Sequence, residues 1–264
     1  MMILTWAPLC LLLARAAPPA AAARKEEGLN VLGGEDVAAN QYDYVVGVYN
    51  TPKNSRTYSV CSGSIINAHW VLTAGHCVEN SSPSTHVVEV EAGAKSLANA
   101  QTVRAEKWFT HERYRNLQDP TTRVYYDIAL IKLHDSLLQV RNTAIATLPS
   151  SGRDDPGRSS TVEIVGFGTE GQGSLATKRK GILKKAEMKV QGTCRNTLPS
   201  SYCIKVVDAT GRSCPGDSGG PMVYRGRVVG VSSTGNPCTT RRGDAQYTRV
   251  SSFLDWINQK IRQE

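Results

Sequence analysis

Short apolar runs separated by turn residues extend along most of the chain and constrain its fold more than any other feature. Ten such runs lie between residues 45 and 250, and Gly, Pro, Asn and Ser recur between them. This spacing predicts an antiparallel sandwich or barrel. No long helical interval separates the runs, which disfavours a parallel sheet with crossover helices. The predicted strands are Val45–Tyr49, Ser62–Ile66, Trp70–Thr73, Val87–Ala92, Ile128–Leu133, Thr161–Phe167, Ala186–Val190, Pro221–Tyr224, Arg227–Ser232 and Gln246–Val250.

The end of the chain has the period of an amphipathic helix. Ser251 or Ser252 can cap its first turn. We expect this helix to be a packing element. The apolar residues that recur at helical spacing are Phe253, Leu254, Trp256, Ile257 and Ile261.

The composition excludes several classes of protein. Of the 264 residues, 40% are apolar and 20% are charged, which excludes a disordered tail protein and a multi-span membrane protein. The length suffices to bury a core without help from a metal. The net charge of +8 is spread along the chain, and no nucleic-acid-binding module or aromatic stacking motif is present. We therefore expect no nucleic-acid partner.

Residues 1–23 have the pattern of a secretory signal. An apolar run from Met2 to Leu13 is followed by small residues that end at Ala23, and the run is too short to span a membrane. No later stretch approaches the ~18 apolar residues that a span needs. We expect a secreted, extracellular protein without a membrane anchor.

Six of the seven cysteines remain after the signal is removed with Cys10. An even number in an exported chain favours three disulfides, for which fifteen pairings are open. Zinc is disfavoured because the chain has no CxxC pair. Asn80-Ser81-Ser82 is a glycosylation acceptor. The six cysteines are Cys61, Cys77, Cys194, Cys203, Cys214 and Cys238.

Ser218 lies in the segment Gly216-Asp217-Ser218-Gly219-Gly220-Pro221. Flanking glycines let a substrate approach closely, but a serine needs a base within hydrogen-bond reach to act as a nucleophile. The same segment matches the elbow of α/β-hydrolases, in which the histidine follows the serine. Chain order rejects that fold, because every histidine precedes Ser218. The histidines are His69, His76, His86, His111 and His134.

Two residues upstream can activate this serine. His76 adjoins Cys77, whose disulfide would fix its backbone. Asp127 stands at the edge of an apolar run, where a partly buried carboxylate can orient an imidazole. The order histidine, aspartate, serine is that of a known catalytic triad.

The motifs TAGHC, DIAL and GDSGGP together resemble the chymotrypsin/trypsin family of serine endopeptidases. They follow one another with 51 and 91 residues between the three candidate residues, and the match extends from Val31 to the terminal helix. The resemblance implies an all-β fold of two six-stranded antiparallel β-barrels with a C-terminal helix. The site would lie between the barrels, with Ser218 as nucleophile, His76 as base and Asp127 orienting it. The N–H groups of Gly216 and Ser218 would form the oxyanion hole.

The resemblance also implies disulfides, cofactors and partners. It pairs Cys61 with Cys77, Cys194 with Cys203 and Cys214 with Cys238. Members use no catalytic metal, and Gly93-Ala94-Lys95 lacks the acidic ligand of calcium-binding relatives, so no cofactor or metal is expected. Partners would be protein or peptide substrates and protein protease inhibitors, and we expect a monomer.

Members of the family are made as zymogens. Residues 24–30 would be the activation propeptide and residues 31–264 the protease domain, with the freed amino group of Val31 pairing with Asp217. The residue before the cut is usually Arg or Lys but is Asn30 here, so self-activation of the trypsin type is not expected. An asparagine-specific processing enzyme and an untrimmed, weakly active precursor are both open.

The specificity pocket departs from the family pattern at Arg212, which stands six residues before Ser218 where aspartate selects Lys or Arg. Arginine keeps its charge, and burial without a partner would be costly. It can receive an acidic substrate side chain, fold across the pocket and favour small or apolar side chains, or pair with Asp244. Tryptic specificity is not expected.

The remaining predicted substrate contacts surround this position. Ser213 adjoins Arg212, and Ala245 follows Asp244. Ser233-Thr234-Gly235 fits the segment that pairs with the substrate backbone as an added strand. Thr234 replaces the usual Trp, so extended specificity does not carry over.

The segment Lys178-Arg179-Lys180 is densely basic. It is either a solvated loop or a polyanion site. The rival to an enzyme is a catalytically silent homologue that acts as a binding or decoy protein. The presence of His76, Asp127 and Ser218 favours the enzyme.

Overall fold

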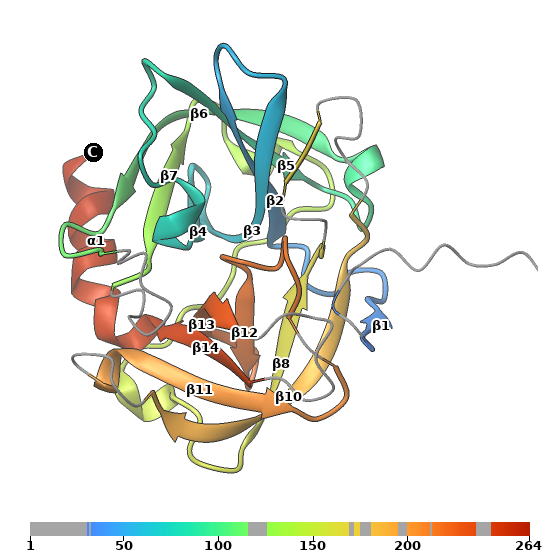
Figure 1. Ribbon diagram of the computed structural model, residues 1–264, viewed down its shortest axis with the longest axis vertical. Helices are drawn as coiled ribbons and strands as arrows, with labels where there is room; N and C mark the ends of the chain where they lie inside the picture. The colour runs from blue at the N-terminus through green and yellow to red at the C-terminus, as the bar shows by residue number, and fades with distance from the viewer. Residues whose placement is uncertain are drawn as a thin grey trace, which may run out of the picture.

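The structure is a computed structural model that describes Val31 and residues 33–115, 126–168, 172–174, 181–194, 200–211, 213–235 and 244–264 (Figure 1). Several predictions fall outside the described residues. These are the signal and propeptide segments with Asn30, the pocket residue Arg212, the cysteine Cys238 and the basic segment Lys178-Arg179-Lys180.

The first half of the chain forms a closed antiparallel barrel of six strands in the order β2-β5-β6-β7-β4-β3, which closes where β3 pairs with β2. A seventh strand, β9 (Gln172–Ser174), comes from the second half and pairs with the outer end of β3. The barrel strands are β2 (Val45–Pro52), β3 (Thr57–Asn67), β4 (Trp70–Thr73), β5 (His86–Ala92), β6 (Gln101–Thr110) and β7 (Ala129–Leu133).

The second half forms another closed six-stranded barrel in the order β10-β11-β14-β13-β12-β8, which closes between β8 and β10. The short strand β1 (Glu35–Asp36) extends it at β10. Figure 1 shows one barrel above the other, and the prediction of two six-stranded barrels is confirmed. The strands are β8 (Thr161–Gly166), β10 (Lys184–Thr193), β11 (Cys203–Asp208), β12 (Pro221–Tyr224), β13 (Arg227–Gly235) and β14 (Asp244–Arg249).

All ten predicted runs lie on strands, but two barrel strands, β6 and β11, were not predicted. Buried Val103 and Ala105 of β6 alternate with exposed Arg104 and half-buried Glu106, so charged residues mask its apolar face. In β11 the buried Ile204 and Val206 flank the half-buried Lys205. Both strands are buried on one face only, and their alternation is too short to stand out in the sequence.

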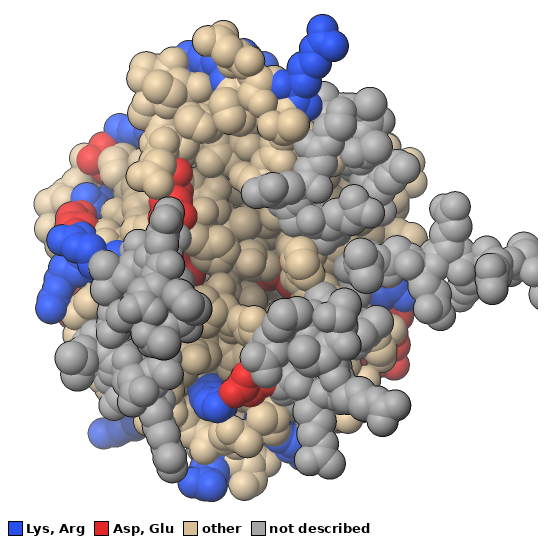
Figure 2. Space-filling model, viewed as in Figure 1, with Lys and Arg blue, Asp and Glu red and all other residues tan. Residues whose placement is uncertain are grey.

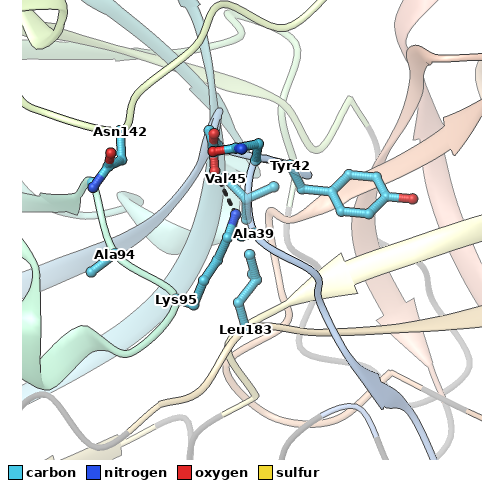
Figure 3. Close-up of a pocket in the computed structure, with 10 residues that line it drawn as sticks. Ala39, Tyr42, Val45, Ala94, Lys95, Asn142 and Leu183 are labelled. Atoms are coloured by element: carbon cyan, nitrogen blue, oxygen red, sulfur yellow. Dashed lines mark hydrogen bonds and ion pairs between the residues drawn. The ribbon is translucent and has the colours of Figure 1, made fainter.

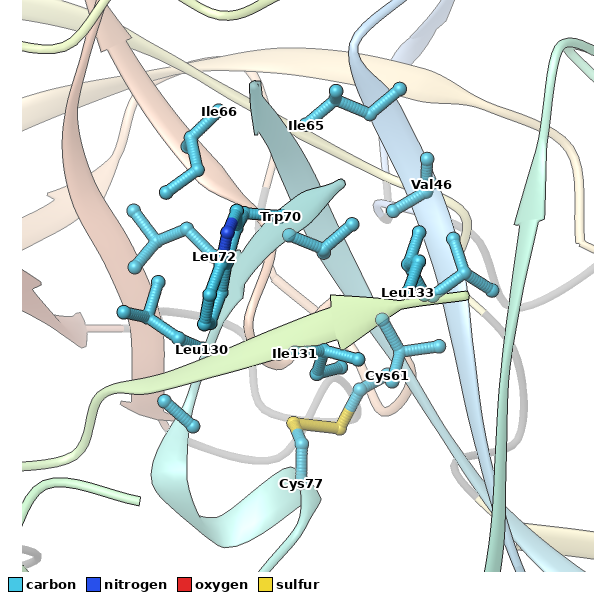
Figure 4. Packing of buried hydrophobic residues seen from close by; sticks show 14 of the residues in the cluster. Val46, Cys61, Ile65, Ile66, Trp70, Leu72, Cys77, Leu130, Ile131 and Leu133 are labelled. Carbon is cyan, nitrogen blue, oxygen red and sulfur yellow. A yellow bond between two sulfur atoms is a disulfide. The ribbon is translucent and has the colours of Figure 1, made fainter. Parts of the chain in front are cut away.

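Each barrel has its own apolar core, and a third cluster joins them. Figure 4 shows the first core around Ile65, Trp70, Leu72 and Leu130, next to the Cys61–Cys77 disulfide. The second core contains Val31 among its strand residues. The third cluster combines residues of both barrels and seals the interface between them: Val45, Tyr49, Tyr58, Val60 and Leu97 from the first half with Val165, Phe167, Leu183 and Val223 from the second.

The C-terminal helix α1 (Leu254–Gln263) confirms the predicted helix. Its buried Ile257 joins the core of the first barrel, so the end of the chain packs on the first half. The prediction of a serine cap is wrong. A 3₁₀ turn, Val250–Phe253, precedes α1 and makes Phe253 the N-cap, while Ser251 donates to Asp155 instead.

The structure confirms the two predicted disulfides whose cysteines are both described. These are Cys61–Cys77 and Cys194–Cys203. Cys214 is also disulfide-bonded. Its pairing with Cys238 stays a prediction, because Cys238 lies outside the described residues. None of the helices in the described ranges is long and apolar enough to cross a bilayer.

Candidate active site

His76 is held by a tight turn at the end of β4. It lies in the 3₁₀ turn Gly75–Cys77, and the disulfide from Cys77 to Cys61 ties this turn to β3. A Cβ at position 75 would lie 2.9 Å from the Tyr114 ring, so a residue larger than glycine would displace that ring. The backbone around the imidazole is therefore fixed by covalent and steric contacts.

Asp127 stands just before β7 and is only 1% exposed. Its Oδ1 accepts from the backbone N–H of His76 at 2.9 Å, and its Oδ2 lies 2.8 Å from Nδ1 of the His76 ring. Ser233, on β13 of the other barrel, donates its hydroxyl to the same Oδ2 at 2.6 Å. The Thr248 hydroxyl of β14 donates to the Asp127 carbonyl at 2.8 Å. Both barrels thus position this carboxylate.

The two partners shift each other's pKa toward the charged forms. Burial raises the pKa of Asp127, but the charge and hydrogen bonds of His76 outweigh it and hold the pKa below its ordinary value. Burial lowers the pKa of His76, but the carboxylate of Asp127 outweighs it and raises the pKa. An ionised Asp127 keeps a proton on Nδ1 of His76 and leaves Nε2 as the free base.

Ser218 is half-buried, and its segment contacts the first barrel. Its carbonyl accepts from the Ser62 N–H at 2.7 Å. The adjacent Gly219 has a φ of +78°, and a Cβ there would overlap the Thr73 hydroxyl and crowd the backbone N of Ala74 at 3.0 Å. The nucleophile segment therefore contacts the chain two residues before His76.

The geometry joins His76 and Asp127 directly, and it places Gly219, next to Ser218, against Ala74, two residues before His76. Among the described residues, no hydrogen bond links the Ser218 hydroxyl to His76. Catalytic hydrogen bonds often tighten only in the substrate complex. The triad and the oxyanion hole of Gly216 and Ser218 stay predictions.

The region around the predicted pocket is polar. The Ser213 hydroxyl lies 3.2 Å from the Tyr247 hydroxyl, and burial raises the pKa of Tyr247. Gly235 pairs with buried Ala245 across β13 and β14. Thr234 is half-buried in the same strand. The sequence did not predict the contact of Tyr247 with Ser213 or the hydrogen bond from Ser233 to Asp127, because no local sequence pattern marks either contact.

Asp244 has a partner other than the one considered from the sequence. Its Oδ2 lies 2.5 Å from the Lys205 ammonium on β11. Pairing of Asp244 with Arg212 stays untested, because Arg212 lies outside the described residues.

Asp217 is a second buried carboxylate, 3% exposed. Its two oxygens accept from the backbone N–H groups of Gly168 and Cys214, each at 2.8 Å. No cation in the described part of the chain forms an ion pair with it, and burial raises its pKa to about 7. The Val31 side chain is buried in the second barrel, but the predicted ion pair of Val31 with Asp217 stays a prediction.

One cavity adjoins His76 and another lies apart from it. The cavity apart from His76, shown in Figure 3, has a volume of about 190 Å³ and contains the ion pair of Lys95 with Asp43 at 2.6 Å. It lies at the Gly93-Ala94-Lys95 loop, where we expect no calcium. The cavity beside His76 has a volume of about 540 Å³. It is lined by Asn50, Pro52, Thr57, Tyr58, Ser59, His76, Glu79 and His86.

The one group of metal-ligating side chains among the described residues is Cys61, His76 and Cys77. Both sulfurs belong to the Cys61–Cys77 disulfide, so they offer no thiolate to a metal. The described part of the site pairs an imidazole with a carboxylate, an arrangement that can perform acid–base chemistry.

Two barrels, with a buried aspartate that pairs with a half-buried histidine where they meet, define a chymotrypsin-like serine protease fold. The family model described as Trypsin matches residues 31–257, and the chain belongs to this family. Human Trypsin-3 is 29% identical over 91% of this chain and 80% of its own length. Trypsin Blo t 3 of Blomia tropicalis is 31% identical over 87% and 85%, and human Serine protease 1 is 30% identical over 83% and 90%. This homology supports a serine endopeptidase, a hydrolase with protein substrates.

Proposed function

We propose that this chain is a secreted serine endopeptidase that cleaves peptide bonds through an acyl-enzyme, with a primary specificity other than tryptic. Ser218 attacks the scissile carbonyl while His76 takes its proton, and Asp127 stabilises the imidazolium. The N–H groups of Gly216 and Ser218 donate to the oxyanion. His76 then protonates the leaving amine, and water, with His76 again as the base, hydrolyses the ester. The observation that carries this proposal is the buried Asp127 carboxylate, bonded to His76 beside the Ser218 segment.

Labelling with an organophosphorus serine reagent tests the mechanism. The protein starting at Val31 should be modified once, at Ser218, and Ser218→Ala should abolish the labelling. Ser84→Ala removes an exposed hydroxyl that belongs to none of the proposed catalytic groups and should leave labelling intact. Absence of label on correctly processed protein would contradict the proposal.

The rival proposal is a silent homologue that works as a binding or decoy protein. It is favoured by the departures at Asn30 and Arg212 alone. If Ser218→Ala retained the whole biological effect while the wild type resisted labelling, the decoy would be the better description.

Activation at the Asn30–Val31 bond accompanies the enzyme proposal. Residues 1–23 would be the signal, residues 24–30 the propeptide and residues 31–264 the protease domain. The buried Val31 side chain and the lack of a cation beside Asp217 among the described residues support it. An asparagine-specific processing enzyme or an untrimmed, weakly active precursor would explain Asn30. Amino-terminal sequencing of the secreted protein decides, and a start other than Val31 contradicts the proposed switch.

The specificity follows from the charge of Arg212. Because Asp244 already pairs with Lys205, we favour an Arg212 that meets an acidic substrate side chain or closes the pocket for small and apolar ones. A fluorogenic peptide panel with Glu, Asp, Ala, Leu, Tyr and Lys at the cleaved position separates these cases. Arg212→Ala should remove a preference for acidic residues. A strong preference for Tyr or Leu would reject the acidic alternative.

Three further proposals concern the surface. Asn80 is exposed and would carry a glycan, which endoglycosidase treatment would detect as a loss of mass. Lys178-Arg179-Lys180 would bind a polyanion, although the described Lys and Arg side chains on the face in Figure 2 are dispersed. Heparin chromatography with all three replaced by Ala tests this. Protein inhibitors would occupy the substrate cleft, and the protein would be a monomer.

A further inference from the structure

We propose that Ser62 is a positioning residue for the oxyanion hole, an inference that rests on the proposed function. Ser62 belongs to β3 of the first barrel and is 0% exposed. Its hydroxyl donates to the carbonyl oxygen of Gly216 at 2.9 Å, across the interface between the barrels. The Ser62 hydroxyl oxygen in turn accepts from the Phe167 N–H at 3.4 Å. The hydroxyl thus restrains a residue whose N–H belongs to the proposed hole.

The backbone of Ser62 also holds the nucleophile segment. Its N–H donates to the carbonyl of Ser218 at 2.7 Å. Its own carbonyl accepts from the hydroxyl of Thr73, the last residue of β4, at 2.8 Å. This bond ties Ser62 to that strand. Ser62 is therefore bonded to both residues, Gly216 and Ser218, that supply the donors of the hole.

Gly219 and Gly220 pack so closely against Ser62 that neither position has room for a Cβ. A Cβ at Gly220 would lie 3.1 Å from the Ser62 Cβ, and one at Gly219 would overlap the Ser62 carbonyl. The side chain of Ser62 therefore acts on a segment already seated against its backbone. Removing the hydroxyl alone would leave these backbone contacts in place.

Gly216 needs such a restraint because glycine has more backbone freedom than any other residue. Its φ is +91°, in the left-handed region. A hydrogen bond to its carbonyl limits rotation about its backbone bonds and so helps to fix the direction of its N–H. Donors held in place before the reaction stabilise the developing oxyanion without a cost of reorganisation. The loss of one hole donor costs ~10²–10³ in turnover, and a loosened donor should cost less.

The test compares Ser62→Ala with Ser64→Ala in the protein starting at Val31. Ser64 lies on the same strand and is 1% exposed, but among the described residues its hydroxyl makes no hydrogen bond to the nucleophile segment. The first readout is the split between kcat and KM on the best peptide of the specificity panel. Ser62→Ala should lower kcat by roughly 10- to 100-fold with little change in KM, whereas Ser64→Ala should retain kcat.

The second readout distinguishes the oxyanion from binding in general. A peptidyl trifluoromethyl ketone adds to Ser218: the Oγ–carbon bond forms, the carbonyl electron pair becomes the oxyanion, and the hydroxyl proton passes to His76. The matching trifluoromethyl alcohol fills the same subsites without forming an oxyanion. In Ser62→Ala the Ki of the ketone should rise by the same factor as kcat falls. The Ki of the alcohol and the pH midpoint set by His76 should not move.

Two results would overturn the inference. One is an equal loss of kcat in Ser62→Ala and Ser64→Ala, and the other is an equal rise in the Ki of ketone and alcohol. If Ser62→Ala does not fold, Ser62→Cys, which keeps a weak donor in a similar volume, should give a smaller shift in the same direction. A wild type that neither hydrolyses the peptide nor binds the ketone would refute the proposed function instead.

Discussion

Asp127 and Asp217 are both buried carboxylates beside the proposed nucleophile, yet their surroundings shift their pKa values in opposite directions. Asp127 has His76 and the Ser233 hydroxyl as partners, and its pKa is lowered. Asp217 has two backbone N–H donors but no cation among the described residues, and its pKa rises to about 7. Burial raises the pKa of both, so the partners decide the outcome.

The two carboxylates differ in whether folding alone supplies their charge partner. The partners of Asp127 are residues of the folded barrels, so folding alone prepares its pair with His76. Asp217 has a charge that is costly to bury unpaired, and the proposed cation arises only when the bond before Val31 is cut. On the proposed activation, the precursor would have one carboxylate already paired and the other waiting for the new amino group, and it would be inactive until it is processed.

The largest expected effect is that of Asp127→Asn. The amide removes the charge that stabilises the His76 imidazolium and favours the wrong tautomer, so kcat should fall by ~10⁴. Steady-state hydrolysis of the preferred peptide by the processed protein measures it. Asp135→Asn, at an exposed position, makes the same change on the surface and should leave kcat unaltered. A loss below tenfold in Asp127→Asn would mean that this carboxylate does not serve His76.

A smaller effect is expected from Asp217 in the uncleaved chain. Its folded pKa of about 7 lies above its ordinary value of 3.8, so the protonated form favours folding. The contribution of protonated Asp217 to the free energy of unfolding is complete below pH 3.8 and is lost as the pH rises toward 7. The loss is roughly 4 kcal/mol at most. Urea unfolding of the Ser218→Ala precursor between pH 4 and 7 should show this decline, and a further Asp217→Asn change should flatten it.

The processed protein supplies the control for Asp217. With the Val31 ammonium beside it, Asp217 should stay ionised at pH 7, and Asp217→Asn should now destabilise the protein and lower its activity. Equal pH slopes in the precursor with and without Asp217→Asn would contradict the difference we draw between the two carboxylates.

Local sequence patterns predicted most of the strands and the candidate catalytic residues, but they did not predict the long-range contacts between side chains. His76, Asp127 and Ser218 stand in short motifs, and the ten predicted runs have the apolar alternation of strands, so both could be found from the sequence. The hydroxyl of Ser62 meets Gly216 from 154 residues away, and Ser233 meets Asp127 from 106. Serine is common in every kind of segment, so no local signal marks these two. Only the closure of both barrels brings them to their partners.

The disulfide beside His76 should have the next largest effect. Cys61 and Cys77 are 16 residues apart, and closing a loop of this length contributes about 3 kcal/mol in the chain-entropy model. Replacing both with Ala should lower the free energy of unfolding by about that amount and should also lower kcat, because the turn that holds His76 loosens. Removing the Cys194–Cys203 pair, 9 residues apart, should cost less stability and little kcat. Equal effects on kcat would show that the disulfide does not position His76.

The smallest effect is expected from Ser233→Ala, which removes one donor to Asp127 and leaves His76 in place. A hydrogen bond to a charged group contributes about 1.5–3 kcal/mol, so kcat/KM should fall by roughly 10- to 100-fold. The pKa of Asp127 should rise, but the carboxylate should remain ionised at neutral pH because the imidazole still faces it. The acid limb of the pH profile should therefore keep its shape. If Ser233→Ala were as damaging as Asp127→Asn, the serine rather than the imidazole would hold Asp127 in its charged form, and the contrast with Asp217 would need a different cause.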